Sequence, residues 1–93
     1  LLRNDVARTV KELRNNFRWF RNAPEPQQNV LIEVCFQLGL PTFKKFKRMI
    51  NALEREEYKR AAAELLDSRY AQQCPGRVAR YAERLHGYKT PRR

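Results

Sequence analysis

The segment from Pro26 to Leu38 is apolar on most sides, and this feature constrains the fold more than any other. Its apolar residues are Val30, Leu31, Ile32, Val34, Cys35, Phe36 and Leu38. Apolar side chains around most of the circumference predict a helix that lies in the centre of a fold. Gly39 and Pro41 follow the segment, and these residue types indicate that the helix ends there.

Helical spacing also governs the rest of the chain. Val6, Val10, Leu13 and Phe17 recur at steps of three and four, which predicts a first helix that Asp5 caps and that ends among residues 22–26. Further helices are expected from Thr42, with Phe43, Phe46, Met49, Ile50 and Leu53 on the inner face, from Glu56, over Ser68–Gln73, and from Pro75 to Gly87. No segment alternates with period two, so no sheet is expected.

The sequence therefore predicts an all-α fold, a compact bundle of five to six helices around a central apolar helix. We divide the chain into a connecting helix (residues 1–24), a helical lobe core (25–88) and a basic tail (89–93) that is expected to fray.

Composition narrows the choice of partners. Lys and Arg number 20 against 10 Asp and Glu, which gives a net charge of +10. Such a surplus favours nucleic acid, an anionic lipid surface or an acidic cell-wall polymer, unless it serves only as a solvated surface. No apolar run is long enough to span a membrane, and no secretory signal is visible. Two cysteines and one histidine cannot supply four zinc ligands, so no metal or other cofactor is expected.

A polar stripe interrupts the apolar central segment. Asn29, Glu33 and Gln37 are spaced by four residues and share one side of the predicted helix. Glu33 is the one carboxylate on this helix. We expect a structural role for it, as the buried partner of Arg77 or Arg80 from the last helix.

Four short motifs in this chain occur in order and at the spacing found in phage-type lysozymes. They are Phe36-Gln37-Leu38-Gly39, Ala61-Ala62, Ser68-Arg69-Tyr70 and Gln73-Cys74-Pro75-Gly76-Arg77. Arg80 matches a further arginine, and Asn4-Asp5-Val6 resembles part of the helix that joins the two lobes of that family. The stretch from Gln27 to Leu85 resembles the helical lobe without a gap.

The resemblance implies the substrate-facing helical lobe of an endolysin, a muramidase that cleaves bacterial peptidoglycan. It implies a phage or prophage product made in the bacterial cytoplasm and acting on the cell wall. In that family the catalytic Glu, Asp and Thr lie in a second, N-terminal lobe, and no position of these 93 residues matches them. We therefore expect no catalytic residue here, no activity from this chain alone, and the N-terminal catalytic lobe as its partner.

Two sets of residues follow from the resemblance. Gln37, Tyr70, Gln73 and Cys74 are expected to line the substrate cleft. Glu33, Arg77 and Arg80 are expected at the interface between lobes, where the arginine matched by Arg77 faces the catalytic glutamate. The other carboxylates offer no acid pair, since Glu54, Glu56 and Glu57 lie among cations, and Glu64, Asp67 and Glu83 are expected on outer faces.

Two other hypotheses remain open. A basic helical nucleic-acid-binding module would use Lys44, Lys45, Lys47 and Arg48, although the residues between them look like a core face rather than a recognition surface. Self-association through the first helix would use the apolar area of Phe17, Trp19 and Phe20.

Overall fold

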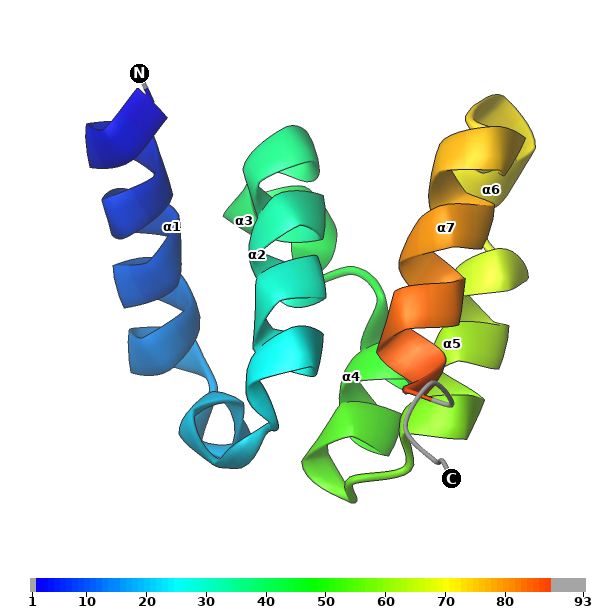
Figure 1. Cartoon of the computed structure of the whole chain (residues 1–93), viewed down its shortest axis with the longest axis horizontal. Helices are drawn as coiled ribbons and strands as arrows, with labels where there is room; N and C mark the ends of the chain where they lie inside the picture. The colour runs from blue at the N-terminus through cyan, green and yellow to red at the C-terminus, as the bar shows by residue number, and fades with distance from the viewer. Residues whose placement is uncertain (1, 88–93) are drawn as a thin grey trace.

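The central segment forms a buried helix, α2 (Glu25–Leu38), as its composition predicts. We describe a computed structural model that covers the backbone of residues 2–87 and the side chains of residues 6–87. In Figure 1, α2 lies between α1 (Leu2–Asn16) and α7 (Pro75–His86), and it packs against both and against α3 (Leu40–Phe43). Pro26 lies in the first turn, and Gly39 ends the helix with φ of +86°.

The burial of α2 is less complete than its composition suggests. Val30, Leu31, Val34 and Cys35 are at most 1% exposed, but Phe36 is 41% exposed. The polar stripe of Asn29, Glu33 and Gln37 is exposed to solvent, so the expectation that Glu33 is buried is wrong. Two neighbours, α1 and α7, flank α2 and leave this side open.

The first helix is shorter than the apolar spacing indicates. α1 ends at Asn16, and a 3₁₀ helix, η1 (Arg18–Asn22), follows it. Since α1 begins at Leu2, Asp5 is not its N-cap. Gln28 of α2 donates hydrogen bonds to the carbonyl oxygens of Phe20 (2.9 Å) and Arg21 (3.4 Å), which fixes η1 against α2.

The helix expected from Thr42 is two helices, α3 and α4 (Lys47–Glu54), and Thr42 lies inside α3 rather than capping a helix. In the intervening turn, Lys45 N donates to Thr42 O and Phe46 N donates to Phe43 O. Phe43 and Met49 are both buried, although residues six apart lie on different sides of a continuous helix. The break lets both side chains enter one core.

The last three helices form the other half of the molecule. They are α5 (Tyr58–Leu66), α6 (Arg69–Gln73) and α7. α5 begins two residues later than expected, because Glu56 has a φ of +62° in the preceding turn. Ser68 caps α6 by accepting a hydrogen bond from Ala71 N. Pro75 begins α7 and Gly87 ends it in the left-handed conformation, as predicted.

The fold is all-α, as predicted. Over residues 2–87 it comprises seven α-helices and one 3₁₀ helix, with no strand. The count exceeds five to six because of the break after Phe43 and the 3₁₀ turn. Leu13 and Phe20, from the expected connecting helix, are buried in the same core as Leu31 and Leu85. No helix in the described part of the chain is long and apolar enough to cross a membrane. The predicted tail, residues 89–93, lies outside the described residues.

Candidate functional site

Two polar contacts join α2 to α7. Arg77 donates a hydrogen bond to Gln37 Oε1 at 3.2 Å, and Arg84 donates to Glu33 Oε2 at 2.8 Å. The two helices are antiparallel, because the later residue of α2 meets the earlier residue of α7. The expectation that Glu33 pairs with Arg77 or Arg80 is wrong: its partner is Arg84, two turns beyond Arg77.

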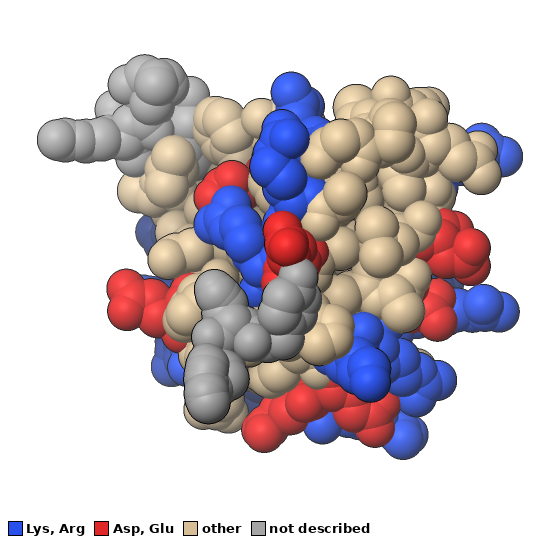
Figure 2. Space-filling view, turned by 45° about the vertical axis from the view of Figure 1, so that its right-hand side comes forward, with Lys and Arg blue, Asp and Glu red and all other residues tan. Residues whose placement is uncertain are grey.

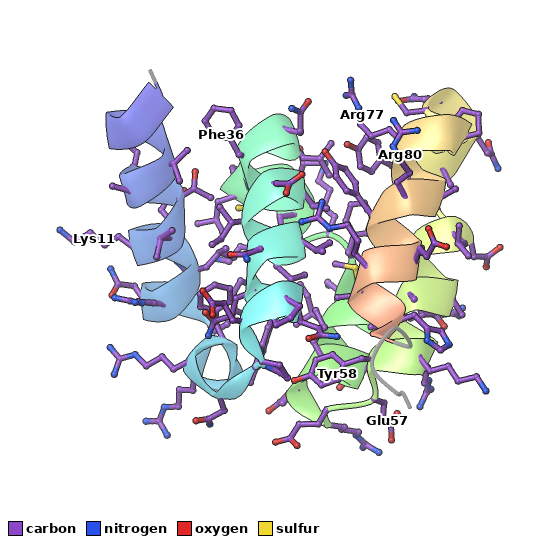
Figure 3. The ribbon with its side chains drawn as sticks, in the orientation of Figure 1. Lys11, Phe36, Glu57, Tyr58, Arg77 and Arg80 are labelled. Carbon is purple, nitrogen blue, oxygen red and sulfur yellow. The ribbon has the colours of Figure 1, made fainter. Side chains whose placement is uncertain are left out.

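The Glu33–Arg84 ion pair lies at the surface. The two side chains are 46% and 45% exposed, so the buried pair expected from the sequence does not exist. The hydrogen bond to Glu33 raises the pKa of Arg84. Pairs with this exposure contribute about 0–1 kcal/mol to stability. Arg77 contacts an amide rather than a carboxylate, and no hydrogen bond or ion pair of Arg80 is found within the described residues. Both arginines project from the first half of α7 (Figure 3).

A groove of about 700 Å³ lies beside this edge, between α4, α5 and α6. Tyr70 and Gln73, two of the four predicted cleft residues, line it. The other lining residues are Leu38, Thr42, Lys45, Phe46, Lys47, Arg48, Met49, Glu64, Asp67, Ser68 and Arg69. Gln37 is not part of the lining, although Leu38 beside it is. Cys74 is half-buried and packs against the core instead.

Tyr70 is the most unusual residue of the groove. Its side chain is only 8% exposed, and its buried hydroxyl has no hydrogen-bond partner within residues 6–87. A hydroxyl buried in this way costs about 1–3 kcal/mol of desolvation. Tyr81 of α7 lies close enough to both sites to interact with them: burial is the main cause of its raised pKa, Tyr70 and Glu33 raise it further, and Arg77 and Arg84 lower it.

The rim of the groove carries charges of both signs. Lys45, Lys47, Arg48 and Arg69 provide four positive charges, and Glu64 and Asp67 provide two negative charges. No ion pair joins any of these six among the described residues. Lys and Arg side chains also lie beside Asp and Glu side chains on the face of the molecule that Figure 2 shows. Leu38, Phe46 and Met49 contribute apolar surface to the same groove, which therefore suits a ligand with both polar and apolar parts.

Sequence reasoning missed several of these residues. Glu64 and Asp67 were expected on outer faces, and they line the groove because the break after Phe43 moves α4 beside α5 and α6. The break leaves no clear signal in the spacing of apolar residues. Arg84 did have a signal, since seven residues separate it from Arg77, and this spacing places both on one face of a helix.

A second cavity and the two cysteines offer fewer groups that could bind a ligand or react. The cavity, of about 670 Å³, lies where α2 begins and α7 ends, and Gln27, Tyr58, Arg84 and His86 contribute to its lining. Cys35 is buried, and burial, with a smaller effect of Glu12, raises the pKa of its thiol to about 11. Among the described residues, no group of three or more His, Cys, Asp or Glu side chains is arranged to hold a metal ion.

The residues of the four sequence motifs thus come from α2, α5, α6 and α7 and from the residues that cap them. Gln37 and Arg77 are in direct contact, and Tyr70 and Gln73 share a groove. Comparison with protein-family models, with curated proteins and with solved structures finds no match for this chain.

Proposed function

We propose that this chain is the substrate-facing helical lobe of a muramidase that hydrolyses bacterial peptidoglycan, with the catalytic acid supplied by a second lobe. The observation that carries the proposal is the groove with Tyr70 in its wall. The Tyr70 hydroxyl has no hydrogen-bond partner among the described residues, and a hydroxyl can both donate and accept a hydrogen bond. A glycan or stem peptide offers the matching hydroxyl, amide and carboxylate groups.

The polar edge beside the groove supports the role of an interface between lobes. Arg77 donates a hydrogen bond to the Gln37 amide, and Arg80 has no carboxylate partner among the described residues. Guanidinium groups bind carboxylates through two parallel hydrogen bonds. In the proposal, a carboxylate of the catalytic lobe docks on Arg77, as the resemblance implies, and Gln37 positions the guanidinium. In the proposal, the protein is made in the bacterial cytoplasm and acts on the cell wall.

The experiment measures binding and turnover separately. The 93-residue chain is sedimented with peptidoglycan from which anionic polymers have been stripped, and the release of reducing sugar ends is followed. The proposal predicts binding without turnover. Robust turnover would contradict the assignment of catalysis to another lobe, and absence of binding would contradict the proposed function.

Two adjacent glutamines provide a matched comparison. Gln73 lines the groove, whereas Gln72, on the same helix, is exposed and outside it. Gln73→Ala is expected to weaken binding by about two- to tenfold, the value of one hydrogen bond. Gln72→Ala is expected to leave it unchanged. Equal effects of the two substitutions would show that the groove is not the binding site.

Nucleic-acid binding remains the alternative. Its proposed helix would include Phe43 and Met49, but both are buried, which leaves few side chains for reading bases. Titration with duplex DNA at several salt concentrations separates the hypotheses: a clear sequence preference would favour this function, whereas a salt-dependent interaction without preference would report only the net charge.

A further inference from the structure

Five cations project from α1 and η1, on the side of the molecule away from the groove. These residues, which we call the cationic strip, are Arg8, Lys11, Arg14, Arg18 and Arg21. Residues 6–24 contain one acid, Glu12, beside these five cations, so this segment carries a net charge of +4. Two fifths of the net charge of +10 is therefore concentrated in this segment.

The strip faces solvent and is held in place. All five side chains are exposed, whereas Thr9 and Leu13, on the opposite side of α1, are buried. Figure 3 shows Lys11 pointing away from α2. No hydrogen bond or ion pair of the five side chains occurs among the described residues. The hydrogen bonds from Gln28 hold η1, which carries Arg18 and Arg21, against α2.

The strip has the character of a site for a linear polyanion. Arg8 and Arg14 lie about 9 Å apart along the axis of α1, with Lys11 between them, and Arg18 and Arg21 follow on η1. Four of the five residues are arginines, whose guanidinium forks match phosphate oxygens. A lipid surface fits less well, because an interfacial helix inserts its apolar side, and α1 uses that side to pack Leu13 into the core.

We propose that the cationic strip binds a linear phosphodiester polymer of the bacterial cell wall, of the poly(glycerol phosphate) type. The choice of a wall polymer rests on the proposed function. α1 and the α5–α7 half lie at opposite ends of the long axis of the molecule, which measures 34 Å (Figure 1). A polymer on the strip therefore leaves the groove open, and it holds the lobe at the wall while the groove engages peptidoglycan.

The test titrates soluble poly(glycerol phosphate) into the 93-residue chain at several salt concentrations. If all five cations contact phosphate, the logarithm of the affinity falls against the logarithm of the salt concentration with a slope of about −3.5, from roughly −0.7 per contact on a single-stranded chain. Arg8→Gln/Lys11→Gln/Arg14→Gln is expected to reduce the slope by about 2 and to weaken binding at low salt by at least about tenfold. Glutamine preserves helix propensity, and a thermal melt verifies folding.

The matched control removes three other exposed cations, in Lys44→Gln/Arg55→Gln/Lys59→Gln. It has the same net charge, and its three positions lie outside both the strip and the groove. A clearly smaller loss in the control supports the strip, and equal losses would overturn it. Tighter binding to duplex DNA than to the polymer at equal salt would overturn the choice of a wall polymer. Sedimentation with polymer-free peptidoglycan reports on the groove alone: if that binding is absent while polymer binding persists, the proposed function fails and the strip stands.

Discussion

Replacing Tyr70 with phenylalanine is expected to stabilise the protein while weakening its binding to peptidoglycan. The substitution removes only the hydroxyl, which is buried and has no partner in the part of the chain that the structure describes, and it keeps the ring that packs against the core. The unfolded chain hydrates this hydroxyl, whereas the folded chain bears a desolvation cost of about 1–3 kcal/mol. The free energy of unfolding should therefore rise by about 1 kcal/mol or more, which in a domain of this size raises Tm by roughly 4–8 °C per kcal/mol.

The assay is urea or thermal denaturation of Tyr70→Phe beside Tyr58→Phe. Tyr58 is half-buried, lies outside the groove, and loses the same atom, so its substitution should change stability by less than about 0.5 kcal/mol. Binding to polymer-free peptidoglycan should fall about two- to tenfold for Tyr70→Phe alone. A Tyr70→Phe variant that is less stable than the parent would refute the reasoning, because the hydroxyl would then have a partner within the folded chain.

Three further predictions concern the core, a helix end and a thiol. Leu31→Ala should lower the free energy of unfolding by about 3–5 kcal/mol, because Leu31 is fully buried in α2. The same deletion in Leu66→Ala, at a side chain that is 51% exposed, should lower it by under about 1 kcal/mol. Similar shifts of the denaturation midpoint in the two variants would contradict the central place of α2. Gly87→Ala should cost about 1–3 kcal/mol, since the φ of Gly87 is +72° and the added Cβ meets Nε2 of Gln27, which donates a hydrogen bond to Leu85 O. Gly76→Ala, with nothing near the added Cβ, should be neutral or slightly stabilising. Calorimetry that ranks the stabilities of the two variants the other way would refute this prediction. Burial and, secondarily, Glu12 raise the pKa of Cys35 from 9.0 to about 11, so unfolding releases a proton between these pH values. The contribution of the neutral thiol to stability is therefore fully present below about pH 9 and is lost as pH rises through 11. Cys35→Ala should abolish this part of the pH dependence in denaturation curves measured across that range.

The sequence predicts the parts of this fold that depend on local chemistry. Gly39 and Gly87 end helices because each has a positive φ, and Pro75 begins one because its missing N–H has no partner to lose. Helical spacing also identifies Leu13, Leu31 and Leu85 as core residues. These features depend only on residues that are close together in the sequence, so they can be predicted from the sequence alone.

Other features depend on contacts between distant segments. The break between Phe43 and Met49 allows both side chains to pack into the core, and no turn residue in the sequence marks this break. The pairing of Glu33 depends on the antiparallel register of α2 and α7, which places it beside Arg84 rather than Arg77 or Arg80. The candidate site was accordingly predicted in part: Gln37 meets Arg77, and Tyr70 and Gln73 share a groove, but its charged rim depends on the position of α4.

The most direct test of the central claim follows backbone amide chemical shifts by NMR while soluble peptidoglycan fragments, stripped of anionic polymers, are added to the labelled chain. The claim is that the groove between α4, α5 and α6 binds peptidoglycan. It predicts saturable shifts around Tyr70 and Gln73, extending to Gln37 and Arg77, with the amides of Arg8 to Arg14 unchanged. Shifts confined to α1 and η1, or none at millimolar fragment, would contradict it.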